Sequence, residues 1–310
     1  MKNTVKSFQL FVRPDEKSLH IANDIRKINS KIENPLQESQ DGDLIIAIGG
    51  DGTFIHAVTN TGFSKKKIYT GIHTGTLGFM QDLSAEDIFS LMQYINFKSE
   101  ITTRKVYISH VKVFLIDNTE IGFYSLNEVL VVGKDYSKIS FAEYINGELL
   151  QNVSGNGIVI ATSTGDTAYS LSANGAIDFS RNFQLVCTLE TPIRNAAYER
   201  FITNPVICSK INIVLEPSDE ICIIIDGRTR KIDSKLIKEI EVSMVDDSNY
   251  INKLDLTNYS KVRVVRNKIL GYQWVLLKFY KYTNTLPIFY KFGSVFFIQF
   301  LKKYDKINLD

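Results

Sequence analysis

The sequence has few of the residues that hold small secreted or metal-bound proteins together. Its 310 residues include only three cysteines, Cys187, Cys208 and Cys222, and no two of them are close in sequence. Disulfide frameworks and structural zinc sites use cysteines at short, paired spacings, so we expect neither. Three isolated cysteines are typical of buried thiols in a reducing compartment, and we therefore expect a cytoplasmic protein.

Long apolar runs and a strong net charge are also absent. No stretch approaches the 18 or so apolar residues of a membrane span, and the N-terminus lacks the apolar core of a signal peptide. The formal net charge of +2 gives no electrostatic reason to expect nucleic acid as a partner. With 44% hydrophobic and 23% charged residues, the chain has the composition of a globular protein of two domains.

Several catalytic signatures are missing as well. The chain has no Gly-Lys-Ser/Thr phosphate loop, which excludes P-loop chemistry. It has no Ser-His-Asp arrangement and no cluster with metal-ligand spacing, so we expect no metal site built by the protein alone. The isolated His20, His73 and His110 are expected to be structural or solvated.

Strand-like and helical patterns alternate over the first 99 residues. Short apolar runs are followed by stretches whose apolar residues recur every three to four positions, and Ser84 is a good N-cap for the last of them. This alternation predicts an α/β domain with a parallel sheet over residues 1–99. The expected strands are 7–13, 44–48 and the start of 66–80, and the expected helices are 15–32, 54–61 and 84–95.

Strand-like runs broken by turn residues dominate residues 100–265. Asn146-Gly147 carries the signal of a tight hairpin. The one clear helix should begin at Thr167, with Asp166 as its N-cap. We therefore predict a β-rich second domain that closes back on the first.

Aromatic residues and lysines crowd the C-terminal extension, residues 266–310. Lys278, Lys281 and Lys291 rule out a clean membrane span. We expect a segment that folds back on a groove or serves in assembly. Contact of this basic, aromatic segment with a membrane surface is the less favoured alternative.

A glycine-rich loop follows a buried-strand pattern in the stretch IIAIGGDGTF, residues 45–54. The two glycines allow the backbone to turn sharply and to approach another molecule closely. A strand that ends in glycines and one acid is how an open α/β sheet presents backbone N–H groups to phosphate. An ordinary tight turn is the alternative interpretation.

Polar groups interrupt apolar strands at two later places. Asn127-Glu128 lies inside an apolar run, where an amide and a carboxylate must find partners. The two side chains suit a ribose diol or an adenine edge, although a satisfied structural pair is the alternative. The segment 154–177 contains a Gly-x-Gly turn, an apolar strand and a helix start beside Tyr169 and Ser172, which would offer N–H groups to a ligand.

The segments GGDGTF, HTGTLGF, NE, GNGIVIATSTGDTAYSLSANGAI and IDGR resemble, in this order, the bacterial NAD kinase family over roughly residues 40–265. GGDGT alone is shared with lipid kinases, whereas the NE strand and the TAYS segment are more specific. The resemblance implies an α/β domain, a β-rich domain for NAD binding and oligomerisation, and an active site between subunits of a homodimer or homotetramer. It implies transfer of a phosphoryl group from ATP or polyphosphate to the 2′-hydroxyl of the NAD adenosine ribose, with Mg²⁺ accompanying the donor.

The resemblance also assigns roles to individual residues. Asp51 matches the catalytic base of the family. The other matches belong to a phosphate-facing turn, the walls of the adenosine pocket, the pair that holds the second ribose and adenine, the segment beside the nicotinamide, and a late Asp-Gly turn. The nucleotide-binding residues implied in this way are Gly50, Gly52, Thr53, Phe79, Asn127, Glu128, Thr167, Ala168, Tyr169, Ser172, Thr191 and Gly227.

Several positions depart from the family pattern. The family's Arg-Gly-Asp-Gly is Ser-Gly-Asn-Gly at 154–157, and His56 stands five residues after the base, where Arg or Lys is usual. We keep His56, Ser154 and Asn156 among the expected nucleotide-binding residues. Because asparagine lacks the charge of aspartate, we expect Asn156→Asp to tighten the binding of NAD and to leave NADH nearly unchanged.

Two other functions stay open at this stage. The hydrophobic C-terminal extension would be compatible with a lipid kinase that acts on diacylglycerol or sphingosine, although the NE and TAYS segments favour NAD as the substrate. A catalytically weak, NAD-binding member of the family is suggested by Ser154 and Asn156.

Overall fold

The computed structural model describes residues 5–75, 78–97, 100–180, 183–193, 202–216, 219–244, 247–256 and 259–269. The chain forms two compact units, Met1–Thr257 and Asn258–Asp310. The described part of the second unit contains α5 (Lys261–Lys268), whose first turn is capped by the Ser260 hydroxyl. Most of the expected C-terminal extension, from residue 270 onward, lies outside the described residues.

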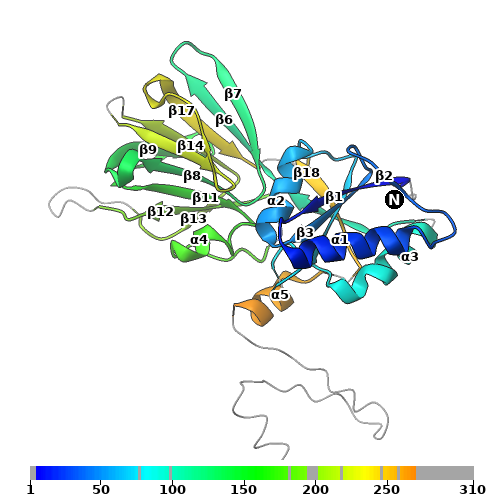
Figure 1. Ribbon diagram of the computed structural model, residues 1–310. Helices are drawn as coiled ribbons and strands as arrows, with labels where there is room; N and C mark the ends of the chain where they lie inside the picture. Colours follow the sequence, from blue (N-terminus) through cyan, green and yellow to red (C-terminus); the bar gives the residue numbers. More distant parts are fainter. Residues whose placement is uncertain are drawn as a thin grey trace, which may run out of the picture. The chain divides into compact units, whose positions relative to one another are not determined.

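A six-stranded sheet with the order β2-β1-β3-β4-β18-β5 forms the α/β part of the first unit (Figure 1). Its first five strands run parallel, and β5 pairs antiparallel with β18. This arrangement confirms the predicted α/β fold with a parallel sheet. The strands are β1 (Ser7–Val12), β2 (Gln37–Glu38), β3 (Leu44–Gly49), β4 (Ile68–His73), β5 (Thr103–Tyr107) and β18 (Tyr250–Leu254).

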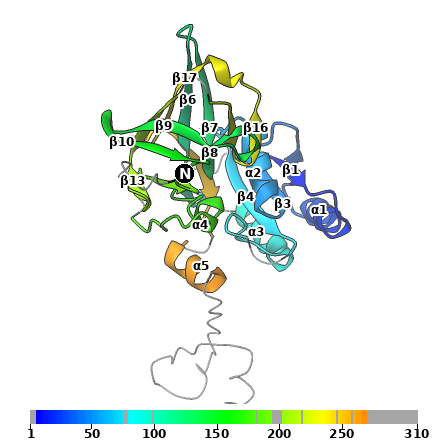
Figure 2. The same cartoon turned by 90° about the vertical axis from the view of Figure 1, so that its left-hand side faces the viewer.

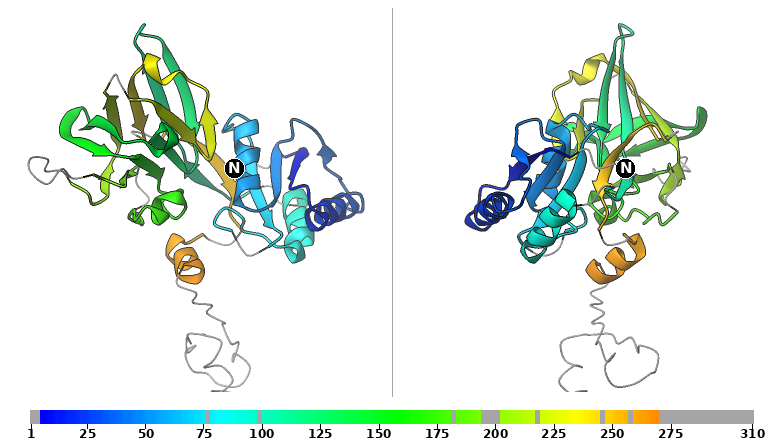
Figure 3. Two further views of the ribbon diagram at one scale, coloured as in Figure 1. Left: turned by 60° about the vertical axis from the view of Figure 1, so that its left-hand side comes forward. Right: turned by 90° about the vertical axis from the view of Figure 1, so that its right-hand side faces the viewer.

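Helices cover both faces of this sheet because successive strand residues point to opposite sides. Leu44, Ile46 and Ile48 of β3 pack in one buried cluster with α1 and α3, which lie together in Figure 3. Ile45 and Ala47 pack in a second cluster with α2. The helices are α1 (Glu16–Asn29), α2 (Asp51–Asn60) and α3 (Ile88–Phe97).

Three local features of this part refine the expectations from the sequence. The helix after the glycine-rich loop begins at Asp51 instead of residue 54, with Gly50 as its N-cap, so the acid lies in the first helical turn. Ser84 forms the expected cap through a reciprocal capping box with Asp87, in a short 3₁₀ turn that leads into α3. Strands β5 and β18 join this sheet although both come from beyond residue 100.

Two antiparallel six-stranded sheets pack over one hydrophobic core in the remainder of the first unit. Figure 2 views them from the side of β9, β10 and β13. The second sheet contains β10 (Glu148–Gly155), β9 (Ile139–Ile145), β14 (Lys210–Leu215), β17 (Ile237–Ser243), β6 (Ser109–Leu115) and β7 (Glu120–Ser125), in this order. The third sheet contains β13 (Val206–Cys208), β12 (Leu185–Glu190), β11 (Gly157–Thr162), β8 (Glu128–Gly133), β15 (Ile221–Ile225) and β16 (Arg228–Arg230).

The two sheets confirm the predicted β-rich architecture. Asn146 and Gly147 form the hairpin between β9 and β10, with φ angles of 50° and 92°. These left-handed values are those that a two-residue hairpin loop requires. In the part of the chain that the structure describes, no helix is both long and apolar enough to cross a bilayer.

Candidate functional site

Asp51 stands at the junction of β3 and α2, where its carboxylate is held by backbone groups. It accepts hydrogen bonds from the N–H of Phe79 at 2.7 Å and of Met80 at 2.9 Å. Gly78 lies so close that a Cβ atom there would be 2.1 Å from Asp51 Oδ1. The loop after β4 therefore closes on the carboxylate only because residue 78 is glycine, and the two glycine-rich loops meet as their places after neighbouring strands predict.

The backbone beside Asp51 is open to the outside. Apart from chain neighbours and the backbone of α2, no atom of the described residues lies within 4 Å of the positions that a Cβ would occupy at Gly50 and Gly52. The carbonyl oxygen of Gly50 accepts from Gln81 Nε2 at 2.6 Å, which fixes the start of α2. The first N–H groups of a helix have no partner within the helix and favour an anion, so this loop can receive a phosphate.

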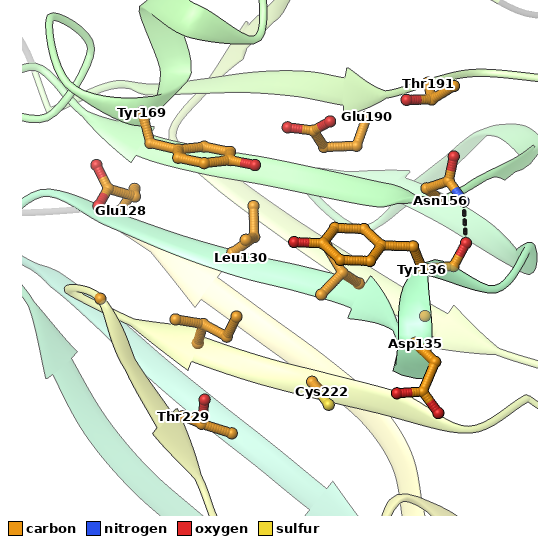
Figure 4. Close-up of a pocket in the computed structure, with 14 residues that line it drawn as sticks. Glu128, Leu130, Asp135, Tyr136, Asn156, Tyr169, Glu190, Thr191, Cys222 and Thr229 are labelled. Atoms are coloured by element: carbon orange, nitrogen blue, oxygen red, sulfur yellow. Dashed lines mark hydrogen bonds between the residues drawn. The ribbon is translucent and has the colours of Figure 1, made fainter.

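A cavity of about 530 Å³ lies on the face of the third sheet that points away from the sandwich core (Figure 4). Alternation along β8 explains its floor, because Val129 and Val131 point into the core whereas Leu130 and Val132 point into the cavity. The other residues that line it are Glu128, Gly133, Asp135, Tyr136, Asn156, Tyr169, Glu190, Thr191, Cys222, Ile224, Gly227 and Thr229.

Asn127 and Glu128 carry unpaired acceptor atoms at the start of β8, and of the two only Glu128 lines the cavity. Asn127 Oδ1 and Glu128 Oε2 are both buried and have no hydrogen-bond partner among the described residues. Burial, together with the nearby Asp226 carboxylate, raises the pKa of Glu128 to about 7, although a hydrogen bond from the Tyr169 backbone N–H acts in the other direction. A buried acceptor without a partner costs free energy, so a ligand that donates to it would bind favourably.

Asp226 fixes the backbone that carries these two side chains. Its carboxylate accepts from Ser125 Oγ at 2.9 Å and from the backbone N–H of Leu126 at 2.8 Å, Asn127 at 2.7 Å and Glu128 at 3.3 Å. Burial raises its pKa although these donors act in the other direction. The sequence pointed to the Asp-Gly turn but not to this role, because the carboxylate meets its donors about 100 residues away along the chain.

The short helix α4 (Tyr169–Ser172) differs from its prediction. It begins at Tyr169 instead of Thr167, and Ala168 is its N-cap. Asp166 does not cap it; the Asp166 carboxylate accepts from the backbone N–H of Asp178 at 2.6 Å. The chain before the helix lies close to the Asn127 backbone, where a Cβ at Gly165 would be 2.1 Å from the Asn127 carbonyl oxygen.

Five of the expected binding residues line the cavity: Glu128, Asn156, Tyr169, Thr191 and Gly227. Gly50, Gly52, Thr53 and Phe79 surround Asp51 instead, in the α/β part. Thr167, Ala168 and Ser172 lie in or just before α4 and do not line the cavity.

His56 and Ser154 lie away from the cavity. His56 is exposed on α2, with its ring edge-to-face against Phe11 at a centroid distance of 5.8 Å. Ser154 is buried on β10, where its hydroxyl lies 3.0 Å from that of Ser140. Their roles in binding stay predictions.

Asn156 makes a contact that the sequence did not indicate. Its Nδ2 donates to the carbonyl oxygen of Tyr136 at 2.5 Å (Figure 4). An aspartate has no proton to donate at neutral pH and would face this oxygen with a negative charge. Asn156→Asp would remove this hydrogen bond, and its expected effect on NAD binding stays a prediction.

Three further cavity residues, Asp135, Tyr136 and Glu190, were not anticipated. Asp135 and Tyr136 belong to a turn after β8, and no local sequence motif predicts the conformation of this turn. Glu190 adjoins the expected Thr191, and its place at the end of an apolar strand was the one available signal. Asp135 and Glu190 together with Glu128 make the cavity lining acidic, and none of the described residues that line it is basic.

The Asp51 loop and the Asn127-Glu128 strand share one buried support. Phe54 of α2 and Leu126, which directly precedes Asn127, belong to the same hydrophobic cluster. Met80, whose N–H binds Asp51, is part of this cluster as well. The candidate base and the candidate binding pair are thus anchored to common packing.

A metal site made by the protein alone is not found among the described residues, where no three His, Cys, Asp or Glu side chains could hold one ion together.

Comparisons with known proteins agree with this architecture. The model of the ATP-NAD kinase N-terminal domain matches residues 10–99, and that of the ATP-NAD kinase C-terminal domain matches residues 126–254. NAD kinase 2 of Oceanobacillus iheyensis is 29% identical over 266 residues, which cover 84% of this chain and 97% of that protein.

Two further relatives extend the comparison. An NAD kinase of Lactobacillus delbrueckii subsp. bulgaricus is 34% identical over 221 residues, covering 66% of this chain and 80% of that protein. The crystal structure of yeast NADH kinase complexed with NADH superimposes with a TM-score of 0.71 at 20% identity, over 86% of this chain and 88% of that one. At this identity the likeness of the structures concerns the fold.

Proposed function

Because the chain belongs to the NAD kinase family of phosphotransferases, we propose that it transfers the γ-phosphoryl group of ATP to the 2′-hydroxyl of the adenosine ribose of NAD. The observation that carries this proposal is the pair of buried, unpartnered acceptor atoms, Asn127 Oδ1 and Glu128 Oε2. Ribose hydroxyls and an adenine amino group are donors that such atoms require. A lipid kinase is not favoured, since both matched domains are those of ATP-NAD kinases.

Asp51 is the general base in this proposal. A carboxylate has about four acceptor positions, and the two N–H groups of Phe79 and Met80 occupy only part of them. The remaining lone pairs can take the proton of the ribose hydroxyl while its oxygen forms the new bond to phosphorus and the bond to the leaving ADP breaks. The free space at the backbone of Gly50 and Gly52 would allow the phosphate of the donor to approach the ribose hydroxyl beside Asp51.

Magnesium enters the proposal as part of the Mg·ATP substrate. Polyphosphate is the alternative donor. We also propose a homodimer or homotetramer in the cytoplasm, as the family resemblance implies.

The test is a turnover assay with the purified full chain. NADP should form from NAD and Mg·ATP, and polyphosphate in place of ATP decides the donor. Binding of NAD without formation of NADP would identify a catalytically weak member, and absence of both would overturn the proposal.

A further inference from the structure

Tyr136 occupies a place in the acidic cavity that none of the expected binding residues fills. The residue is 81% exposed, yet it lines the cavity. Figure 4 shows the rings of Tyr136 and Tyr169 entering the cavity from opposite sides, with Leu130 between them. A flat ligand in this space would contact an aromatic ring at each end, above an apolar floor.

The turn that carries Tyr136 is held in an uncommon conformation. Asp135 and Tyr136 have φ angles of 55° and 57°, in the left-handed region that non-glycine residues seldom adopt. Such a conformation persists only where surrounding contacts impose it. Here Asn156 provides two of them, because its Nδ2 donates to the Tyr136 carbonyl and its own carbonyl accepts from the N–H of Gly133 at 2.8 Å.

The charged side chains that line the cavity have one sign. Glu128, Asp135 and Glu190 contribute carboxylates, and the described lining residues include no basic side chain. Aromatic faces and carboxylates both attract cations, and a cavity of low polarity strengthens that attraction. The combination fits a flat ring that carries a positive charge.

We propose that Tyr136, positioned by Asn156, is a binding residue that together with Tyr169 holds the positively charged nicotinamide ring of oxidised NAD. This inference rests on the proposed function for the identity of the dinucleotide. The reduced ring of NADH is neutral and gains only the apolar contacts. The cavity therefore selects the oxidised form, and Tyr136 contributes to that selection.

Calorimetric titration of the full chain with NAD and with NADH tests the inference. Tyr136→Ala should weaken NAD binding about tenfold and NADH binding about twofold, since it removes a cation–π contact from one ligand and an apolar contact from the other. Tyr136→Phe should leave both within about twofold, because the ring stays. Asn156→Ala should shift both ligands in the same direction as Tyr136→Ala by a smaller factor. Tyr124→Ala, on β7 of the second sheet, is the matched control and should change neither.

Three results would overturn the inference. Unchanged NAD binding in Tyr136→Ala would show that the ring does not contact the ligand. An equal loss for NAD and NADH would show that it does not distinguish the charge. A change of oligomeric state in size-exclusion chromatography, together with loss of both ligands, would make Tyr136 a subunit contact instead. Failure of the proposed function is recognised separately, as a wild-type chain that binds NAD with the expected selectivity and forms no NADP.

Discussion

Asp51 and Glu128 are two carboxylates at strand ends, and the protein treats them in opposite ways. Asp51 receives two backbone N–H groups from a neighbouring loop before any ligand arrives. Glu128 receives one, from Tyr169, and leaves Oε2 buried without a partner among the described residues. The difference suits their proposed roles, because a base must be held in place for reaction, whereas a binding group gains affinity from an acceptor that only the ligand satisfies.

The largest effect is expected from a substitution of Asp51. Asp51→Asn keeps the size of the side chain and removes its basicity, so the turnover number should fall roughly 10²–10⁴-fold while NAD affinity changes little. Steady-state kinetics and calorimetry measure the two quantities. Asp87→Asn is the matched control, since Asp87 also accepts a backbone N–H at a helix start, from Ser84 at 2.7 Å, and should keep full turnover. Near-normal turnover in Asp51→Asn would remove it from the role of base.

Glu128→Gln tests the burial of the second carboxylate by changing how stability depends on pH. The pKa of Glu128 is about 7 in the folded protein and 4.5 in the unfolded chain. Between these two pH values the folded chain therefore binds more protons than the unfolded one. The contribution of Glu128 to stability is therefore full below pH 4.5 and is lost as the pH rises through 7, by roughly 3 kcal/mol in all.

Relative to wild type, Glu128→Gln should gain this amount of stability between pH 4.5 and pH 8 in urea unfolding without NAD. Its KM for NAD should rise about tenfold at the same time, because the charged acceptor is gone. Glu148→Gln, exposed on β10, should show the same stability difference at both pH values. A pH-independent difference in Glu128→Gln would show that the carboxylate is not strained by burial.

Asp226→Asn weakens the frame that holds the binding pair. Asparagine tolerates the left-handed backbone at this position, where φ is 50°, but offers one acceptor oxygen and no charge to the donors of residues 125–128. We expect a loss of about 2 kcal/mol in unfolding free energy and a higher KM for NAD in the folded fraction. Asp233→Asn, which removes the capping carboxylate of a 3₁₀ turn, is the control and should leave KM unchanged. An unaltered KM in Asp226→Asn would separate the frame from binding.

Gly52→Ala should give the smallest change in stability and the most specific one in function. Among the described residues its Cβ would meet no atom within 4 Å beyond its chain neighbours and the backbone of α2. Alanine is the better helix former by roughly 0.5–1 kcal/mol, so the melting temperature should rise slightly. The same methyl group would stand where a phosphate approaches the backbone, and the KM for ATP should rise. Gly62, with φ 65°, gives a contrasting variant, since alanine there should lower stability and spare the KM. A Gly52→Ala enzyme with an unchanged KM would place the phosphate elsewhere.

Local chemistry decided what the sequence could predict. The hairpin at Asn146-Gly147, the cap at Ser84 and the buried strand before Asp51 depend on neighbours along the chain, and each was expected. The predicted start of α4 was wrong, because the Asp166 carboxylate binds the backbone N–H of Asp178 and does not cap the helix.

Other features depend on partners far apart in the chain and were missed for that reason. Asp226 accepts hydrogen bonds from residues 125–128, about 100 residues earlier in the chain. The turn at Tyr136 is held by a hydrogen bond from Asn156, 20 residues later. The family resemblance supplied the reaction and the candidate base, but it could not show that this chain uses Asn156 to hold an aromatic residue over the cavity.

The position of β18 in the first sheet has a consequence for how the protein is made. Because β4 pairs with β18, and β5 reaches the sheet only through β18, the sheet begun by residue 7 is finished by residue 254. During synthesis the growing chain carries an open strand edge at β4 until almost all of the first unit has left the ribosome, and such edges pair readily with other chains. A fragment that ends at residue 99 would keep that edge permanently, so the α/β part is a region of the fold that matures last although it is made first.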